Sequence, residues 1–577
     1  MGYKKALCII AAVILILSFG ILSGENNKDT PFEDVPKGHW AEEHIYKLRS
    51  LGITDGISES SFGMGLTINR SEFAAFLVKL MDWGLEYPDK GNFADNLDKS
   101  KWYFPYIETA LVNGSIDNNI EFFRPGEPIT REEMAVMIVR TLGYDSLSKR
   151  LSGYYKPFKD IDRNIGHIAI AKDFDIITGI GGGLFKPDNN AKREEAAAMI
   201  VRMYDRLNTN INHINGFYAI KSANQIDMIK SLNTVGFGWA RLEYDQNKVI
   251  LNTTNKNNNE FSIPVGFNNP LNMAKSNDTG AMLMVFAKDE KAADNGIPLV
   301  EYIIMEPQVR KTVISDIMEQ LSFTEPGNIS VEFDGVVIDF ENLRGDKSKD
   351  NLSKFLRELK KELDKKKKKL YVAVHPTALP GQPYYDGYDF KAIGEIADKV
   401  ILMAHDYYAK QLTEAEMEMG YTITPLTPID DIYWALKQIT DKDKGVQHLE
   451  KILVQLSFDS VQWKLKGGKV INKYPYSPDY EAIRRRLLEE DTEIKYLEVY
   501  ENPYATFYNK EDETGNIVWY EDSRSINAKL KMIKMFGIEG ISLWRLGNIP
   551  DYEDMSGKNI YLDIWQQIIN KPPKAIS

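Results

Sequence analysis

The chain has 577 residues, of which 43% are hydrophobic and 27% charged, a composition typical of folded protein and not of a disordered chain. Its length exceeds what one hydrophobic core organises, so we expect roughly two to four domains. The formal net charge of −12 argues against nucleic acid or an anionic membrane as the main partner, because both attract basic surfaces.

The N-terminus has the order of a Sec-type signal peptide. Lys4 and Lys5 precede an uncharged, mostly apolar run over residues 6–22, and a polar stretch follows. The run is nearly long enough to span a bilayer, so residues 1–24 are interpreted as a signal peptide or an N-terminal anchor. The only cysteine, Cys8, lies in this run, so a processed chain would have no thiol for disulfides, zinc–thiolate sites or nucleophilic catalysis.

An internal repeat occupies the next part of the chain. A Phe-x-Asp element opens each of three segments, at residues 32–83, 93–144 and 158–207. The second helix of each segment is predicted to begin at an arginine followed by acidic residues, and apolar residues then recur at helical spacing. These arginines, 61 and 62 positions apart, are Arg70, Arg131 and Arg193. Each segment is therefore predicted to fold as helix, turn and helix.

The repeats resemble S-layer homology domains, and three tandem copies are specific to that family. The resemblance implies that they bind a secondary cell-wall polysaccharide in grooves between the copies. The candidate contacts are Trp40, Trp102, Arg70, Arg131 and Arg193. A guanidinium group suits an anionic sugar substituent, although the arginines have an alternative role in capping or ion pairing within the helix bundle. The third copy has Ile165-Gly166-His167 in place of the tryptophan, so its groove is expected to be weaker or purely structural.

From about residue 212 the sequence alternates short apolar runs with amphipathic segments, which indicates βα units around a parallel sheet. The eight predicted strands are residues 216–220, 234–240, 281–286, 335–340, 370–374, 400–405, 452–458 and 540–544. They fit an α/β fold, a (β/α)₈ TIM barrel over residues 212–572, after a small all-α repeat module. Residues 470–520 are predicted to form an α+β insertion before the last strand.

The fourth predicted strand ends in two acids. Side chains alternate along a strand, so Asp339 and Glu341 share a face, at the barrel end where such enzymes hold their catalytic groups. A buried acid beside an ionised neighbour has a raised pKa and can act as a general acid. This strand end is therefore predicted to carry the chemistry.

The same strand resembles the Asp-Gly-x-Asp-x-Asp-x-Glu signature of family 18 glycoside hydrolases. Asp334, Gly335, Asp339 and Glu341 match it, whereas Val337 stands where the family commonly has Asp. In the family that middle acid shares a proton with the next one, so one member of the relay is missing here. The acid and the orienting group remain.

Two later segments extend the resemblance. Residues 403–407 follow the sixth strand where the family has Met-x-Tyr-Asp, with His405 in place of the tyrosine that binds the substrate's acetamido oxygen. Trp544 ends the eighth strand as the family's tryptophan does, and Tyr218 ends the first strand, either under the sugar or in the core. The similarity spans about residues 212–560 and is closer to peptidoglycan-type and spore-cortex-lytic members than to large chitinases.

The resemblance implies hydrolysis by substrate-assisted retention, without a metal or cofactor. Glu341 would protonate the glycosidic oxygen while the sugar's 2-acetamido oxygen attacks C1, and Asp339 would orient the acetamide. The candidate substrate-binding residues are Asp334, Met403, His405, Asp406, Tyr407, Trp544 and Tyr218. The expected substrate is an N-acetylhexosamine glycan, with peptidoglycan, chitin and related polymers all open. We expect a secreted bacterial protein associated with the cell wall or S-layer.

Two other functions stay open. His375, His405, Asp406 and Asp339 come from three strand ends and could form the metal site of a polysaccharide deacetylase, although no ligand pair has a recognised spacing. A non-catalytic glycan-binding protein is the other alternative, favoured by the departures at positions 337 and 405. Retention of both acids favours the enzyme.

Overall fold

The structure is a computed structural model that describes residues 31–289, 296–325, 329–405, 407, 411–554 and 557–569. The predicted signal segment, Cys8 and Asp406 lie outside the described residues. The chain forms two compact units, Met1–Leu142 with Phe185–Met203, and Gly143–Leu184 with Tyr204–Ser577. None of the described helices is long and apolar enough to cross a membrane.

The first unit is helical, and its second helices begin at the predicted arginines. Its helices are α2 (Glu42–Ser50), α3 (Arg70–Leu80), α4 (Phe104–Val112), α5 (Arg131–Thr141) and most of α8 (Arg193–Leu207). Glu72 accepts a hydrogen bond from the Asn69 amide at 2.9 Å, and Glu133 does the same for Thr130. These are capping boxes, which explain why the helices start where the sequence predicts.

Backbone hydrogen bonds join the three repeats in a closed ring. The Ile129 amide donates to the Ile68 carbonyl at 3.0 Å, Ala191 donates to Ile129 at 2.8 Å, and Ile68 donates back to Ala191 at 3.2 Å. Each repeat therefore supplies one donor and one acceptor. The ring fixes the starts of α3, α5 and α8 relative to one another.

The third repeat contributes to both units. Its first half holds α6 (Asp145–Leu151) and α7 (Ile165–Asp173), which belong to the second unit and pack on α15 (Ile429–Ile439). Asp173 accepts hydrogen bonds from Tyr433 at 2.5 Å and from Lys437 at 3.0 Å. The position that is tryptophan in the other repeats is thus part of a helix packed in the unit that holds the barrel.

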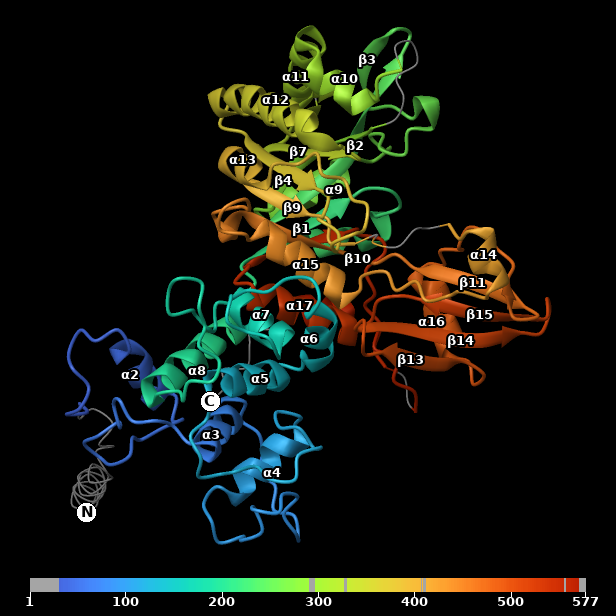
Figure 1. The fold of residues 1–577 in the computed structure, drawn as a ribbon. Helices are drawn as coiled ribbons and strands as arrows, with labels where there is room; N and C mark the ends of the chain where they lie inside the picture. Colours follow the sequence, from blue (N-terminus) through green and yellow to red (C-terminus); the bar gives the residue numbers. More distant parts are fainter. Residues whose placement is uncertain are drawn as a thin grey trace, which may run out of the picture. The chain divides into compact units, whose positions relative to one another are not determined.

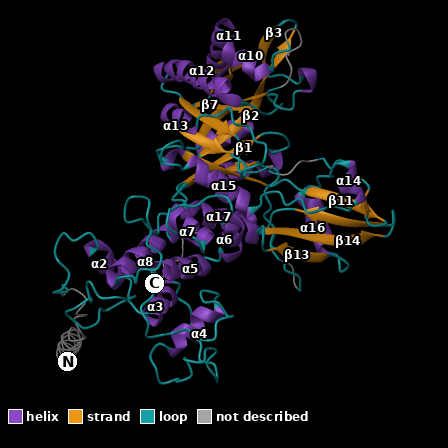
Figure 2. Ribbon diagram, in the orientation of Figure 1, coloured by secondary structure: helices purple, strands orange, loops and turns teal. Residues whose placement is uncertain are grey.

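Eight parallel strands close into a barrel, in the order β1-β2-β4-β7-β8-β9-β10-β16 and back to β1 (Figures 1 and 2). Their bounds are β1 His213–Tyr218, β2 Thr234–Asp245, β4 Gly280–Lys288, β7 Gly335–Glu341, β8 Lys369–Val374, β9 Lys399–Leu402, β10 Ile452–Ser457 and β16 Gly540–Trp544. Each overlaps one of the eight predicted strands, so the predicted TIM barrel is confirmed. The strand β3 (Lys248–Asn252) adds to β2 in antiparallel orientation.

Helices follow the strands around the barrel. They are η2 (Ala223–Ser231), α9 (Asn268–Ser276), α10 (Leu299–Met305), α11 (Pro307–Gln320), α12 (Gly345–Lys365), α13 (Phe390–Ile396), α15, α17 (Ser523–Met535) and α18 (Ile564–Ile569). A short hairpin of β5 (Ser322–Glu325) and β6 (Ile329–Glu332) precedes β7. Inward-facing apolar side chains from β1, β4, β7, β8, β9 and β10 fill the barrel, so it is a packed core.

The predicted α+β insertion is present and starts earlier than expected. Its antiparallel strands are β11 (Val461–Lys466), β12 (Lys469–Val470), β13 (Glu493–Leu497), β14 (Asn502–Asn509) and β15 (Thr514–Trp519) (Figure 2). The helix α16 (Tyr480–Leu488) belongs to the same segment, and α14 (Glu414–Glu418) packs against β12. The strand β11 belongs to the insertion because it pairs with β15, and Trp463 is fully buried in the core of this sheet.

Candidate active site

The two acids lie at the carboxyl end of β7, on its inward face. Val337, two residues before Asp339, packs in the barrel core, and alternation places Asp339 and Glu341 on the same side. Asp339 is 5% exposed, whereas Glu341 is half-buried. Asn342 then adopts a φ of 68°, which ends the strand directly after the second acid.

Burial dominates the electrostatics of Asp339. It raises the pKa of this carboxyl well above its ordinary value, the negative charge of Glu341 raises it further, and His405 lowers it in part. The Asp339 Oδ1 atom is buried and has no hydrogen-bond partner among the described residues. A proton on Asp339 is therefore favoured, and it lies beside the partly accessible Glu341.

Val337 occupies the position of the signature's middle acid, and an apolar side chain cannot take part in proton transfer. Its side chain is fully buried and packs with Met284, Tyr371 and Ala373 in the core cluster. With no carboxylate at position 337 to share a proton, we expect Asp339 to ionise more readily than the member of a proton-sharing pair would. The structure adds that burial and Glu341 keep the pKa of Asp339 raised without that partner.

The residues that begin the sequence signature lie at the other end of the strand. Asp334 accepts a hydrogen bond from the Ala281 amide at 2.8 Å, which ties the starts of β4 and β7 together. A Cβ on Gly335 would lie 2.2 Å from the Lys369 carbonyl oxygen, so close packing of β7 on β8 requires glycine. Asp334 is roughly 16 Å along the strand from Asp339, at about 3.3 Å per residue. The structure does not bring it to the acids.

The two aromatic candidates face opposite sides of the barrel wall. Trp544 ends β16, is half-buried, and packs against Phe217 of the inner cluster with ring centroids 5.3 Å apart. Tyr218 is on the outward face of β1, 6% exposed, in contact with Phe237 and Trp239. Its contacts are those of a core residue, the second role that the sequence left open.

The segment after β9 brings one polar side chain inward. Met403 is buried in the inner cluster, and His405 has its Nε2 atom 2.7 Å from Oε1 of Gln455 on β10. Asp406 lies outside the described residues. Burial raises the pKa of Tyr407, and Asp431 and Asp430 of α15 raise it further, so this hydroxyl lies near α15 and not beside the acids of β7.

Three residues near the acids were not predicted. Gln455 is a lone buried amide within an apolar strand, and that interruption was a usable signal. Asp289 directly follows β4, its amide donates to the Glu341 carbonyl at 3.1 Å, and burial raises the pKa of its carboxyl to about 6. Tyr388 donates to the Phe340 carbonyl at 2.7 Å, and burial raises the pKa of its hydroxyl, with Glu341 adding to the effect. Tyr388 comes from a loop without any sequence signal.

In the repeats, the tryptophans and the arginines have different environments. Trp40 is 54% exposed and Trp102 is 56% exposed. Each arginine is buried and forms an ion pair with the glutamate of another repeat. The pairs are Arg70–Glu133 at 2.5 Å, Arg131–Glu195 at 2.5 Å and Arg193–Glu72 at 2.6 Å. The structure thus supports the alternative role of the arginines, ion pairing within the helix bundle, here between repeats.

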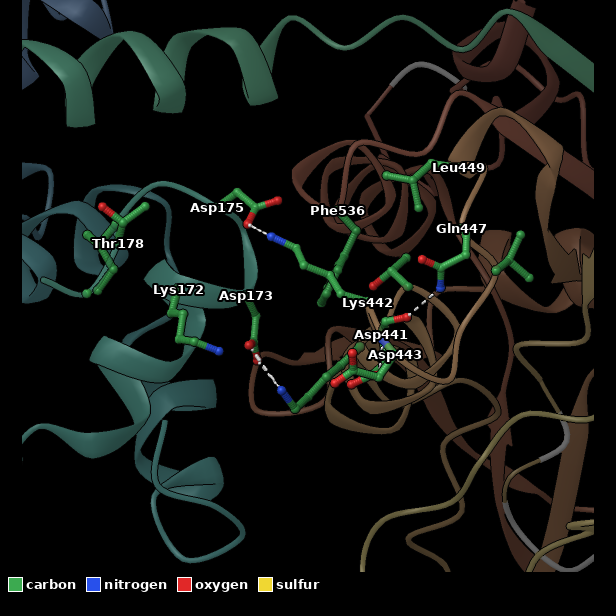
Figure 3. Close-up of a pocket in the computed structure, with 15 residues that line it drawn as sticks. Lys172, Asp173, Asp175, Thr178, Asp441, Lys442, Asp443, Gln447, Leu449 and Phe536 are labelled. Atoms are coloured by element: carbon green, nitrogen blue, oxygen red, sulfur yellow. Dashed lines mark hydrogen bonds and ion pairs between the residues drawn. The ribbon is translucent and has the colours of Figure 1, made fainter. Parts of the chain in front are cut away.

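A separate cleft of about 550 Å³ lies between α7 and α15 in the second unit (Figure 3). Two ion pairs line it, Asp173 with Lys437 at 3.0 Å and Asp175 with Lys442 at 3.1 Å. No lining residue comes from a barrel strand, so this cleft is distinct from the acids of β7. Across the described residues, no group of three or more His, Cys, Asp or Glu side chains is arranged to hold a metal ion.

A closed parallel barrel with two acids at a strand end defines a (β/α)₈ protein with a glycosidase-type site. The sequence profile of Glycosyl hydrolases family 18 matches residues 192–548, and that of the S-layer homology domain matches residues 31–74, 97–135 and 157–197. Because the first match covers more than half of the chain, the chain belongs to glycosyl hydrolase family 18. It carries three S-layer homology domains, which indicate an association with the cell wall or S-layer.

Individual proteins resemble this chain at low sequence identity and over only part of its length. Exoglucanase XynX of Acetivibrio thermocellus is 31% identical over 198 residues, 33% of this chain and 18% of that protein. The cortical fragment-lytic enzyme of Bacillus subtilis (strain 168) is 23% identical over 282 residues, 48% of this chain and 58% of that protein. The chain thus spans less than two thirds of either relative. The solved structure of the Bacillus cereus spore cortex-lytic enzyme SleL is 19% identical with a TM-score of 0.46, covering 62% of this chain and 73% of that one.

Proposed function

We propose that the barrel hydrolyses β-1,4 bonds of an N-acetylhexosamine glycan of the peptidoglycan or chitin type. The observation that carries the proposal is the pair Asp339 and Glu341, on one inward face at the carboxyl end of β7. Similarity to a cortical fragment-lytic enzyme supports the peptidoglycan type. Membership of family 18 supports the reaction class.

The two acids are proposed to share one proton, which Asp339 holds in the free protein and which passes to the partly accessible Glu341, the proposed general acid, when the substrate binds. Glu341 gives its proton to the glycosidic oxygen as the bond from that oxygen to C1 breaks, while the sugar's 2-acetamido oxygen bonds to C1. Water then attacks C1 of the oxazolinium ion and returns a proton to Glu341, so the anomeric configuration is retained. Asp339 orients the acetamide and, when ionised, offsets the positive charge on its nitrogen.

The remaining proposed contacts come from neighbouring strands. Trp544 supplies an apolar surface for the sugar, and Met403 lines the base of the site. His405 and Asp406 are proposed to lie at the acetamido group. We leave Asp334, Tyr218 and Tyr407 out of the proposed site, because their contacts lie at the opposite strand end, in the outer core and beside α15.

Hydrolysis is tested by incubating the full chain with purified peptidoglycan and with chitin oligomers. The expected result is new reducing ends, product masses that together equal the parent glycan plus one water for each bond cleaved, and a first-formed β-anomer detected by NMR. Products with the α-anomer would exclude retention. Bound but intact glycan in both incubations would contradict hydrolysis.

Glycan binding without turnover is the second candidate function. The buried, apolar Val337 favours it, because the carboxylate that usually completes the relay is absent. This candidate predicts saturable binding of an N-acetylglucosamine oligomer with no reducing ends, whereas the hydrolase predicts both. The two are therefore separated by the same incubation.

We propose that the repeats anchor a secreted chain to the bacterial envelope through a secondary cell-wall polysaccharide. Exposed Trp40 and Trp102 are the proposed sugar contacts, and the buried arginines shape the grooves around them. Replacing both tryptophans by alanine in the full chain should abolish sedimentation with intact walls. Walls stripped of polysaccharide by acid should fail to bind the parent. Equal binding of parent and variant, or of both wall samples, would contradict this proposal.

A further inference from the structure

Arg344 lies at the mouth of the barrel, in the loop that joins β7 to α12. It comes three residues after Glu341, so the two Cα atoms are at most about 11 Å apart. Its side chain is exposed, and its guanidinium carbon lies over the ring of Tyr385, 4.5 Å from the ring centre. Tyr385 also contacts the ring of His375, which directly follows β8, with centroids 4.6 Å apart. A cation is therefore held beside the acids, over the adjacent carboxyl ends of β7 and β8.

The loop of residues 384–388 holds this cation in place. The Gly387 amide donates to the Leu343 carbonyl at 3.0 Å. A Cβ on Gly387 would lie 2.6 Å from the Leu343 carbonyl carbon, so this close approach requires glycine. Tyr388 of the same loop donates to the Phe340 carbonyl at 2.7 Å. The loop therefore packs directly on the strand end that carries the acids.

The guanidinium of Arg344 has hydrogen-bonding capacity to spare. Of the five N–H donors of an arginine, it uses one, from Nη1 to the Tyr384 carbonyl at 3.1 Å. Within the part of the chain that the structure describes, no acid forms an ion pair with it, and the acid of the loop, Asp386, accepts instead from the Gly345 amide at 2.8 Å. A guanidinium over a ring face keeps its N–H groups at its edges, in the fork that pairs with a carboxylate.

We propose that Arg344 is a specificity-determining residue that binds a carboxylate carried on a sugar of the substrate. The barrel would then select an acidic N-acetylhexosamine glycan, such as peptidoglycan with its lactyl groups, over neutral chitin. Assigning this carboxylate to the substrate rests on the proposed glycosidase function. Because the chain has a formal net charge of −12, it does not attract an anionic polymer at long range, and the selection requires a direct contact of this kind.

The test measures binding by calorimetry with the full chain in a Glu341→Gln background, so that the ligands stay intact. The ligands are a chitin tetramer, the alternating N-acetylglucosamine and N-acetylmuramic acid tetramer with free lactyl carboxylates, and the same tetramer as its methyl ester. The free acid should bind about 10-fold more tightly than the ester, as expected for one charge-assisted contact. Adding Arg344→Gln should remove this difference and leave the Kd of the ester and of chitin within about twofold. Arg344→Lys should keep only part of the difference, because it keeps the charge and loses the fork.

A fourth ligand identifies the source of the carboxylate. It is the same tetramer with peptides attached through amide bonds to the lactyl groups, so that its carboxylates belong to the peptides. A loss of binding with Arg344→Gln for this ligand as well as for the free acid would show that peptide carboxylates serve equally. A loss for the free acid alone would assign the contact to the lactyl group. Both results support recognition of a carboxylate.

Arg357→Gln is the matched control, because it removes the same charge from an exposed position of α12, about 20 Å along the helix from Arg344. It should leave every Kd within about twofold. Equal losses for acid, ester and chitin with Arg344→Gln would show that Arg344 acts through the loop, and would overturn the proposal. Equal binding of acid and ester before that change would overturn it too. The proposed function fails separately: a parent that binds with this pattern but never hydrolyses glycan would contradict hydrolysis alone, whereas hydrolysis without the pattern would contradict only the role of Arg344.

Discussion

Glu341 raises the pKa of Asp339 from two positions away on the same face of β7, in addition to the larger effect of burial. The two acids therefore do not titrate independently. One is buried and favours its proton, and the other is partly open to solvent. Such a difference in environment separates the roles of two carboxylates, and it makes the effects of replacing each one distinct.

Glu341→Gln should abolish hydrolysis and leave the fold and glycan binding intact. Glutamine keeps the size of the side chain but cannot deliver a proton to the leaving oxygen, so the rate should fall by about 10² to 10⁴. Reducing-end release and calorimetric binding of an N-acetylglucosamine oligomer measure the two effects. Asp334→Asn on the same segment is the control, and it should keep the parent rate because Asp334 only ties β4 to β7. Parent-like turnover by the Gln variant would contradict the assignment.

Asp339→Asn should lower the rate and raise the stability of the fold near neutral pH. The pKa of Asp339 is higher in the folded chain than its ordinary 3.8, so the folded state holds this proton more tightly. The free energy of unfolding of the parent therefore falls as pH rises from 3.8 through the raised pKa of Asp339 in the folded chain. The variant should unfold at a higher temperature than the parent at about pH 7, and the difference should shrink at about pH 3.

Asp398 provides a control of opposite sign for this measurement. Burial alone would raise its pKa, but the Leu370 amide and Lys360 lower it overall. Its stabilising effect is present above the ordinary pKa and is lost as pH falls. Asp398→Asn should therefore lower the unfolding temperature near neutral pH. The same sign for both variants would contradict the electrostatic reading of Asp339.

Val337→Asp should change the pH dependence of hydrolysis, because it places a third carboxyl two residues before Asp339 on the inward face. The position is fully buried among apolar side chains, so the variant should also lose stability, by roughly 1–3 kcal/mol. Rates across pH and thermal unfolding measure the two effects. Val337→Ala controls for altered packing. An unchanged pH profile in an active Asp variant would show that position 337 is not coupled to catalysis.

Glu72→Gln should destabilise the repeats strongly, because it leaves the buried Arg193 without its counter-charge. Arg193 is buried and lies 2.6 Å from Glu72, and loss of one partner of such a pair costs about 3–5 kcal/mol. Asp98→Asn, which removes an exposed pair with Lys101, is the control and should have a far smaller effect on the free energy of unfolding. Denaturant unfolding followed by the tryptophans of the repeats tests this. Equal effects of the two changes would contradict the structural role of the arginines.

Lys437→Met should weaken the packing of α7 on α15. Lys437 lies 3.0 Å from Asp173 and 3.7 Å from the centre of the Tyr155 ring, so the change removes an ion pair and a cation–π contact together. Residues 143–184 should become more sensitive to limited proteolysis. Lys442→Met, which breaks the exposed pair with Asp175, is the control and should not change the digestion pattern. Identical digestion of parent and Lys437→Met would contradict the importance of this contact.

The barrel and the repeats could be predicted from the sequence because their signals are local. Parallel strands buried on both faces are continuous apolar runs, and capped helices that start at an arginine recur at a fixed period. Features that depend on distant contacts could not be predicted in the same way. Asp173 and Lys437 lie 264 positions apart, and nothing near α7 indicates that it packs on α15.

The site was predicted where a motif and strand alternation agree, at Asp339 and Glu341. A motif match does not tell which end of a strand a residue occupies, and for this reason Asp334 was grouped with the acids. Alternation along β1 places Tyr218 and Phe217 on opposite faces of the strand. Only their contacts in the structure show that Phe217 faces the interior of the barrel. The lone amide of Gln455 in an apolar strand signals a polar group at the barrel interior, but only the structure shows that its partner is His405.

The closed ring of backbone hydrogen bonds among Ile68, Ile129 and Ala191 has a consequence for how such chains change during evolution. With two copies, or with a fourth inserted, one backbone amide and one carbonyl at the centre would no longer be placed to form a hydrogen bond. A buried backbone group without a hydrogen-bond partner costs free energy. Loss or duplication of a single copy would therefore cost the repeat unit stability. The number of repeats is set by closure of the ring, so variation should be concentrated in the exposed residues around it.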